Sequence, residues 1–264
     1  TIKVGGVAEY FAEPRNIEEF SDLIKWANLN EQRCQIIGAG SNLLINNIFI
    51  KGLVICTKKM KGLMIEPNSG IVEAEAGVML PTLSNSLAKN GLQGGEWAVG
   101  IPGTLGGAIY MNAGTGNLSL AKNLISVKVI NNKTHEKLEI YKKDINFKYR
   151  FSSFQNNDLV IISAKLLFEP NGNREKLIDT TKNNLKLKTE TQPYHLPSFG
   201  SVFKNPENNY AAKIIDDMGL KGFQIGGAEI STMHANFIVN NSSASSKDIF
   251  ELITVIQQKV LQKK

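Results

Sequence analysis

Ser201 is the first residue whose type and surroundings suggest chemistry. It follows Gly200 in the run SFGSVFKNP, where glycine allows the backbone to bring a serine hydroxyl close to a ligand. The chain has no GxSxG motif and its three histidines are scattered, so a Ser–His–Asp hydrolase is not indicated. A serine without a histidine partner can still donate a proton when the acceptor is a strong base, such as a carbanion.

Arg150 stands between two aromatic residues, Tyr149 and Phe151, in the run YRFSS. A lone surface arginine is not expected in such a place, and the residues alone leave two interpretations open. One is a partly buried structural arginine. The other is a fixed cation that stabilises negative charge as it develops during a reaction.

Two glycine-rich segments have the character of phosphate-binding loops. Residues 91–116 contain nine glycines among small apolar residues, and residues 38–42 read GAGSN after a strand-like run. A GxGxxG fingerprint would need glycine in place of Leu43, and no GxxxxGK[ST] motif occurs, so Rossmann and P-loop sites are not indicated. A tight loop can nevertheless present several backbone N–H groups to an anion.

The donors of these loops lie mainly on the main chain. Pro102 lacks an N–H, and a helical turn starting near Thr104 would favour a pyrophosphate at its N-terminus. Ser41 and Asn42 would add side-chain donors. The N–H groups that we expect to be available in the second loop are those of Gly103, Thr104, Gly106 and Gly107. Two loops without lysine suggest a dinucleotide cofactor, with a tight turn and glycine-mediated close packing as the structural alternatives.

Apolar periodicity and cap residues predict the elements that must position these groups. Asn16 is a predicted N-cap, with Glu18 and Glu19 in the first turn that follows it. Helices are predicted over residues 17–29, 81–90, 173–189 and 209–218, and from Ser245 or Ser246 onward. Strands are predicted over residues 34–37, 43–45, 53–56, 71–76, 125–130, 138–141, 159–168 and 236–239, with another within residues 1–14. Residues 191–206 contain three prolines and are predicted to form a loop.

The composition narrows the classes of partner. Of 264 residues, 42% are hydrophobic and 20% charged, as in a soluble globular protein, and no apolar run is long enough for a membrane span. The formal charge of +6 suits anionic small molecules, and without a long basic run we expect no nucleic-acid partner. Cys34 and Cys56 match no disulfide or zinc pattern, which favours a reducing compartment and no metal site. The start at Thr1 suggests a trimmed chain.

Five separated segments, in this order, resemble the UDP-N-acetylenolpyruvoylglucosamine reductase family. The resemblance covers residues 5–260. It is to the shorter subtype of the family, which lacks the inserted tyrosine loop. The segments are IIGAGSNLL (36–44), GIPGTLGGAIYMNAG (100–114), YRFSS (149–153), PSFGSVFKNP (197–206) and the run formed by residues 219–231 and 234–240. The resemblance implies an α+β protein with an FAD-binding part of the vanillyl-alcohol-oxidase/p-cresol-methylhydroxylase type. That part would comprise two subdomains, 1–57 and 58–190, followed by a substrate-binding domain, 191–264.

The resemblance also implies a reaction. A flavoprotein oxidoreductase would use FAD as cofactor and NADPH as co-substrate to reduce the enolpyruvyl group of a small-molecule UDP-sugar, giving UDP-N-acetylmuramate. Such an enzyme would serve peptidoglycan synthesis, and hence cell shape and division, in the cytoplasm. The oligomeric state does not follow from it, and a monomer is our expectation. Another flavoprotein oxidase of the same fold and a catalytically impaired UDP-sugar binder remain the alternatives.

The site residues implied by the resemblance fall on the segments above. Ser201 would be the proton donor and Arg150 would stabilise the enolate. Substrate contacts would come from Tyr149, Lys188, Lys204 and Asn205. FAD contacts would come from Gly38, Ala39, Gly40, Ser41, Asn42, Gly100, Ile101, Pro102, Gly103, Thr104, Gly106, Gly107, Ala108, Asn112, Ala113 and Gly114.

The sequence departs from the family pattern in places. Asn47 stands where the family has aspartate and Phe49 where it has glycine, and Thr115 begins an unusual continuation after NAG. These changes predict altered local geometry on the FAD side. The family's catalytic glutamate lies in a C-terminal motif that the printed chain, ending at Lys264, does not reach. We therefore carry over no glutamate and expect either a shortened chain or the lack of a third catalytic group.

Overall fold

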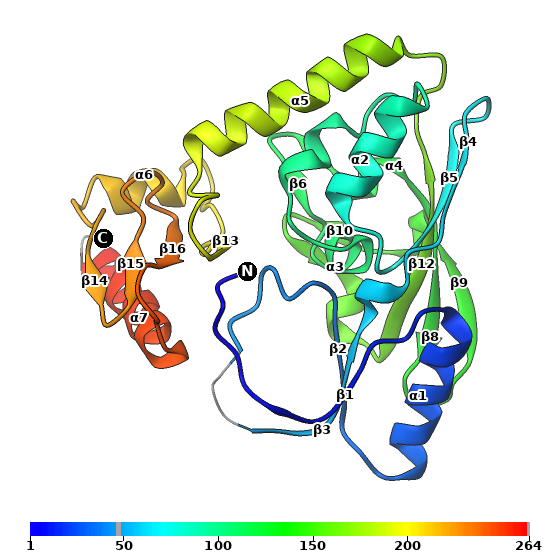
Figure 1. Cartoon of the computed structure of the whole chain (residues 1–264), viewed down its shortest axis with the longest axis horizontal. Coiled ribbons are helices and arrows are strands. Elements are labelled where there is room, and N and C mark those ends of the chain that lie inside the picture. The colour runs from blue at the N-terminus through cyan, green and yellow to red at the C-terminus, as the bar shows by residue number, and fades with distance from the viewer. Residues whose placement is uncertain (46–48, 263–264) are drawn as a thin grey trace. The chain divides into compact units, whose positions relative to one another are not determined.

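The structure of the protein is a computed structural model that describes residues 1–45 and 49–262. Asn47 therefore lies outside the described residues. The chain forms two compact units (Figure 1). Unit 1 consists of Thr1–Val7, Gly40–Ile50 and Leu187–Lys264, and unit 2 of Ala8–Ala39 and Lys51–Lys186. Each unit is described by itself.

Unit 2 begins with a three-stranded sheet in the order β1 (Ala8–Ala12), β3 (Ile50–Cys56), β2 (Cys34–Ile37). Helix α1 (Ile17–Leu29) connects β1 to β2, and its first turn is capped because the Glu19 N–H donates to Asn16 Oδ1 over 2.8 Å. The helix buries Phe20 and Ile24 against Ile55, in a core that also contains the end of the larger sheet. Strands β2 and β3 are parallel, and residues 38–49 connect them.

The main framework of unit 2 is a five-stranded antiparallel sheet in the order β4-β5-β12-β8-β9. Its strands are β4 (Leu63–Glu66), β5 (Ile71–Glu75), β12 (Leu159–Leu167), β8 (Leu124–Asn131) and β9 (Lys137–Tyr141). Helices α2 (Leu80–Lys89) and α3 (Leu105–Tyr110) pack against this sheet (Figure 1). Leu83, Leu105, Ile109, Val127 and Leu166 are fully buried in the resulting core. This core fixes α3, which carries part of the glycine-rich segment.

Short elements complete unit 2. They are β6 (Gly114–Thr115), β7 (Leu118–Ser119), α4 (Leu120–Asn123), β10 (Phe147–Lys148), β11 (Phe151–Ser152) and the single 3₁₀ turns η1 (Thr57–Lys59), η2 (Glu96–Gly100), η3 (Lys142–Asp144) and η4 (Ser153–Asn156). Helix α5 (Arg174–Thr191) starts in unit 2 and ends in unit 1.

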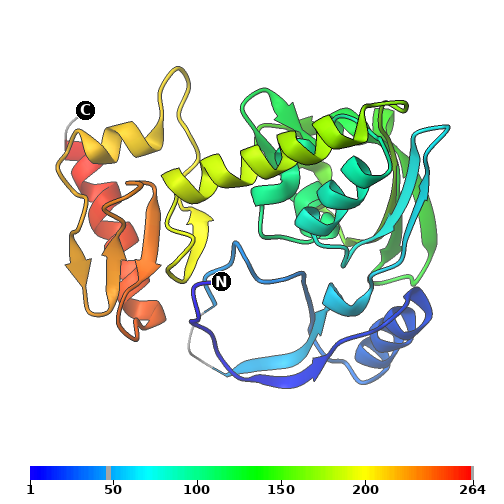
Figure 2. The same cartoon turned by 45° about the horizontal axis from the view of Figure 1, so that its top comes forward.

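Unit 1 is a four-stranded antiparallel sheet in the order β13-β16-β15-β14, with α7 packed along it (Figure 2). The strands are β13 (Ser198–Ser201), β16 (Phe237–Asn240), β15 (Ala228–Ile230) and β14 (Gln224–Ile225), and the helices are α6 (Ala211–Asp216) and α7 (Ser246–Gln262). Ile249, Leu252 and Ile256 of α7 are buried, as their spacing predicts. Ile2 joins the same core, and its carbonyl accepts from Asn240 Nδ2 over 3.0 Å.

Most predicted elements are confirmed within two residues of their ends, and the α+β class is confirmed. Two predictions are wrong. Residues 43–45 pair with no strand in the described part of the chain, and Leu44 instead packs on the core of unit 1. Residues 198–201 of the predicted loop form β13, because they pair with β16. The three-part domain division stays a prediction.

Three further properties concern the described part of the chain. Neither cysteine is in a disulfide, and burial raises the pKa of Cys34 to about 11. No group of three or more His, Cys, Asp or Glu side chains in that part could hold a metal ion. Its helices include none long and apolar enough to cross a membrane.

Candidate active site

Residues 38–42 follow β2 and form a tight loop. Among the described residues, none accepts a hydrogen bond from the N–H groups of 38–42. Gly40 has φ +62°, a left-handed conformation that favours glycine. The Asn42 side chain uses one of its amide hydrogens within unit 1, donating to the Phe199 carbonyl oxygen over 2.9 Å. Within unit 2, Gly38 and Ala39 therefore offer two backbone donors suited to an anion.

The second loop behaves differently from the prediction. Thr104 is the N-cap of α3, so a helix does begin where expected. However, the Gly106 N–H donates to the Ala76 carbonyl oxygen over 2.9 Å, and the Gly107 N–H donates to Thr104 Oγ1 over 3.5 Å. The Gly103 N–H donates to the preceding turn, at the Ile101 carbonyl oxygen.

Three of the four N–H groups expected to be available are thus used inside unit 2, and that expectation is wrong. The reason is that the first turn of α3 docks on the end of β5. For the fourth N–H group, that of Thr104, the described residues supply no acceptor. Gly100 ends η2, and Ile101 and Pro102 lie in the irregular segment before the helix.

The two loops meet within unit 2. A Cβ atom on Gly38 would collide with Thr104 Oγ1, so only glycine allows the backbone of the first loop to lie this close to the N-cap of α3. Thr104 is buried at this contact. The meeting point combines the start of a helix with the N–H groups of Gly38 and Ala39, for which the described residues supply no acceptor. This arrangement fits the pyrophosphate of a dinucleotide cofactor.

Arg150 is held in a fixed position by the main chain of unit 2. Its Nη2 donates to the Gly114 carbonyl oxygen over 2.8 Å, and its Nη1 donates to the Asn112 carbonyl oxygen over 3.4 Å. Its Cζ lies 5.0 Å from the centre of the Tyr149 ring. Arg150 also has φ +52°, which is uncommon for a residue with a Cβ atom. Two of its five N–H donors are used, and the others can still act on a ligand.

Asn112, whose carbonyl oxygen accepts from Arg150, is itself held by its side chain. It is buried, and its Nδ2 donates to the Lys148 carbonyl oxygen over 2.9 Å while its Oδ1 accepts from the Ala121 N–H over 3.4 Å. Its side-chain amide is thus turned to the protein, although the sequence suggested a cofactor contact. The backbones of Ala113 and Gly114 also contact the protein. The Ala113 N–H donates to the Ala108 carbonyl oxygen, and Gly114 in β6 pairs with Ser119 in β7.

Ser201 ends β13 in unit 1 and its hydroxyl is accessible. It is exposed, and no described residue forms a hydrogen bond with its hydroxyl. The pairing of β13 with β16 is irregular between Ser198 and Ser201, where Gly200 has φ +78°. This bulge re-aims the end of the strand, as bulges next to active sites commonly do.

Asn236 holds the segment after Ser201, and the sequence did not single it out. It is 4% exposed, its Oδ1 accepts from the Phe203 N–H over 2.9 Å, and its Nδ2 donates to the Phe203 carbonyl oxygen over 2.9 Å. The Asn236 N–H donates to Nδ1 of His234 over 3.3 Å, and burial is the main cause that lowers the pKa of this imidazole. The signal available in the sequence was an asparagine within the mainly apolar run HANFIVN, since a polar residue in such a run needs hydrogen-bond partners when buried.

The predicted substrate residues lie in both units. Tyr149 is in unit 2, and Lys188, Lys204 and Asn205 are in unit 1. Tyr149, Lys204 and Asn205 are exposed, whereas Lys188 is half-buried in α5. Asn205 has a structural contact as well, since its Oδ1 accepts from the Ala211 N–H at the start of α6 over 3.1 Å. Phe49, at the position of the family glycine, is also exposed.

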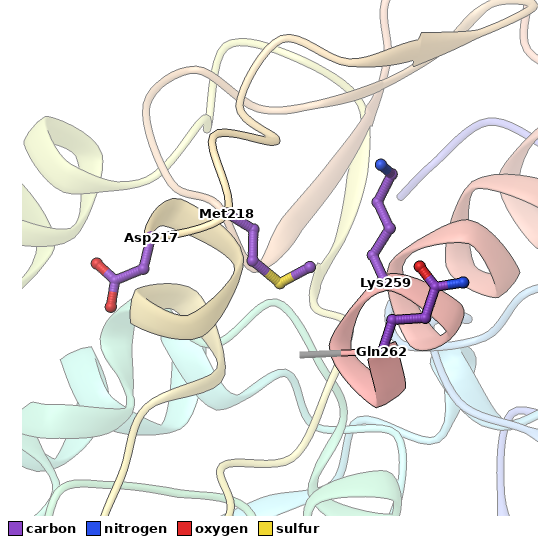
Figure 3. Close-up of a pocket in the computed structure, with 4 residues that line it drawn as sticks. All are labelled: Asp217, Met218, Lys259 and Gln262. Atoms are coloured by element: carbon purple, nitrogen blue, oxygen red, sulfur yellow. The ribbon is translucent and has the colours of Figure 1, made fainter. Parts of the chain in front are cut away.

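A surface hollow of about 390 Å³ in unit 1 contains none of the predicted site residues. It is lined by Asp217, Met218, Lys259 and Gln262 (Figure 3). Met218 extends toward α7, while Asp217 points away from it (Figure 3). The hollow is shallow and open to solvent, and nothing in its lining suggests catalysis.

Gly200 gives a test of how the bulge positions Ser201. We expect Gly200→Ala to destabilise unit 1 by about 1–2 kcal/mol, because alanine resists a left-handed backbone. The matched control is Gly5→Ala in the same unit, where a Cβ atom also meets open space but φ is not left-handed. Tryptophan fluorescence would not report on unit 1, because both tryptophans, Trp26 and Trp97, lie in unit 2. The measurement is therefore hydrogen exchange of the β13 and β16 amides. Equal protection of these amides in both variants would contradict the role of the bulge.

Comparisons with known proteins agree with these motifs. Residues 192–264 match the family model described as "UDP-N-acetylenolpyruvoylglucosamine reductase, C-terminal domain", and residues 8–136 match "FAD binding domain". A UDP-N-acetylenolpyruvoylglucosamine reductase of Prochlorococcus marinus subsp. pastoris (strain CCMP1986 / NIES-2087 / MED4) is 74% identical over 264 residues, which is 100% of this chain and 89% of that protein. The protein of the same name from Prochlorococcus marinus (strain NATL2A) is 48% identical, over 97% of this chain and 88% of that protein.

A solved structure shows the same fold over nearly the whole chain. It is the crystal structure of the UDP-N-acetylenolpyruvylglucosamine reductase (MurB) from Thermus caldophilus, with a TM-score of 0.83 and 31% sequence identity. The similarity covers 97% of this chain and 90% of that one. Taken with the loop that fits a dinucleotide pyrophosphate and the fixed Arg150, these similarities show that the chain belongs to the UDP-N-acetylenolpyruvoylglucosamine reductase family.

Proposed function

We propose that the protein is an FAD-dependent reductase that uses NADPH to convert UDP-N-acetylglucosamine enolpyruvate to UDP-N-acetylmuramate. The observation that carries this proposal is the 74% identity, over the whole chain, to a protein with that reductase name. The FAD binding domain matched over residues 8–136 contains both glycine loops, and their geometry fits the cofactor. The product is a peptidoglycan precursor.

The cofactor and the chain have separate tasks. FAD, when bound, would supply the chemistry of hydride transfer between NADPH and the enolpyruvyl double bond. The N–H groups of Gly38 and Ala39 would hold its pyrophosphate. Arg150 stabilises the negative charge that forms beside the substrate carboxylate, and its two carbonyl contacts hold the guanidinium in place before the charge develops. Ser201 donates the proton that completes the product.

The substrate contacts and the setting are also part of the proposal. Tyr149, Lys188, Lys204 and Asn205 contact the UDP-sugar, where the two lysines suit its phosphates or carboxylate. The enzyme acts in the cytoplasm as a monomer, and its product supports cell shape and division. Sedimentation equilibrium of the purified protein at several concentrations tests the monomer, because a dimer would give a mass above that of one chain, either throughout or as the concentration rises.

An anaerobic experiment tests cofactor, reductant and substrate together. Purified protein reconstituted with FAD should show a flavin absorption band that NADPH bleaches. Addition of the enolpyruvyl UDP-sugar should then restore the band and form UDP-N-acetylmuramate. A protein that takes up no FAD would contradict the proposal, and so would a reduced flavin that the UDP-sugar does not reoxidise. Turnover of an alcohol with oxygen, without NADPH, would instead indicate an oxidase.

A further inference from the structure

We propose that Cys56 and Thr57 are positioning residues that aim the backbone donors of the 38–42 loop at the pyrophosphate. The proposal rests on the FAD part of the proposed function. Neither residue belongs to the motifs that identify the family. Cys56 is the last residue of β3 and Thr57 the first of η1, both in unit 2, next to the point where β2 ends and the loop begins.

The parallel pairing of β2 and β3 brings these side chains to the loop. Ile37 and Cys56 are register partners at the last position of the ladder, so each strand ends beside the other. The Cys56 thiol donates to the Gly38 carbonyl oxygen over 3.3 Å, and the Thr57 hydroxyl donates to the Ile37 carbonyl oxygen over 3.3 Å. Both donors are buried, at 5% and 4% exposure. Water therefore competes little for these hydrogen bonds.

Holding a carbonyl also fixes the donor on the other side of its peptide. The peptide group is planar and trans, so the C=O of one residue and the N–H of the next point in opposite directions. The contact at the Ile37 carbonyl therefore sets the direction of the Gly38 N–H, and the contact at the Gly38 carbonyl sets that of the Ala39 N–H. Both N–H groups are thereby turned away from the end of β3. Neither N–H group has an acceptor in the part of the chain that the structure describes, so the two donors can serve one anion.

The loop needs such external support because of its sequence. Residue 38 must be glycine to avoid a collision with Thr104 Oγ1, and glycine restricts its own backbone less than any other residue. The direction of the two peptide planes then has to come from neighbouring side chains. Without the two contacts, an anion would have to order the peptides as it binds, and this cost lowers affinity.

The test compares variants that keep the shape of a side chain with variants that keep its hydrogen bond. We expect Thr57→Val, which removes the donor, to weaken FAD binding about tenfold, the effect of losing one well-placed hydrogen bond. Thr57→Ser keeps the hydroxyl and should bind FAD nearly as the original chain does. We expect Cys56→Ala to weaken binding about threefold, since a thiol is a weak donor, and Cys56→Ser to restore it.

The control is Thr181→Val, the same change at another buried threonine of unit 2. The described residues supply no hydrogen-bond partner for the Thr181 hydroxyl, so its loss should not alter FAD binding. The readouts are the FAD dissociation constant of each apoprotein, from flavin fluorescence, and the apoprotein melting temperature. A tenfold loss confined to Thr57→Val and rescued in Thr57→Ser supports the proposal. It is overturned if Thr57→Val binds like Thr181→Val, or if Thr57→Ser is as weak as Thr57→Val. Failure of the original chain to bind FAD would instead refute the proposed function.

Discussion

Replacing Ser201 by alanine is expected to leave the reduction of the flavin by NADPH nearly unchanged and to slow its reoxidation by the enolpyruvyl UDP-sugar at least about a hundredfold. That factor is the usual scale of general acid catalysis by a positioned side chain. The two half-reactions separate because a proton donor is needed only after hydride has reached the substrate. Ser201 is exposed, and no described residue forms a hydrogen bond with its hydroxyl. Loss of the hydroxyl should therefore not disturb the pairing of β13 with β16.

The measurement is anaerobic stopped-flow absorbance of the flavin band in each half-reaction. Ser198→Ala is the matched control, because it makes the same change in the same strand, at a residue without a predicted role. It should behave as the original chain in both half-reactions. Equal losses in the two half-reactions of Ser201→Ala would refute the proton-donor role and indicate damage to the flavin site.

Local signals in the sequence were sufficient for most of the fold. Helix α1 was predictable because Asn16, two acidic residues and a helical apolar stripe all agree. The strand predicted over residues 43–45 was wrong because an apolar run indicates burial but does not show whether the residues pair with a strand or only pack on a core. Leu44 packs on the core of unit 1. The identity of β13 depended on Val239 and Phe237, more than 35 residues away, which no local pattern in residues 191–206 could indicate.

The candidate site was predictable in its residues but not in their hydrogen bonds. Glycine composition located both loops, yet whether an N–H is free depends on what packs against it. Ala76 accepts from Gly106, and Thr57 holds the end of β2, and both partners come from other parts of the chain. The role of Asn112 could not be anticipated for the same reason. Its NAG motif suggested a ligand contact, whereas its amide is directed at the peptide of Lys148.

Replacing Arg150 by lysine is the second substitution with a large expected effect. We expect reoxidation of the flavin by the UDP-sugar to slow about 10²–10³-fold, the scale seen when one group that stabilises developing negative charge is removed. A lysine keeps the charge, but a single ammonium cannot span the carbonyl oxygens of both Asn112 and Gly114 as the planar guanidinium does. The cation would lose its fixed position. Reduction by NADPH does not need this cation and should stay within about twofold of the original rate.

The control is Arg15→Lys, the same change at an exposed arginine of unit 2 that pairs with Glu19 over 2.7 Å. An exposed ion pair contributes little, so both half-reactions should be unaffected there. Lysine and arginine both carry a Cβ atom, and the left-handed backbone at residue 150 is therefore equally strained in both proteins. Similar melting temperatures with a selective loss of reoxidation would assign the effect to charge position. If Arg150→Lys reoxidises normally, the partly buried structural arginine becomes the correct interpretation.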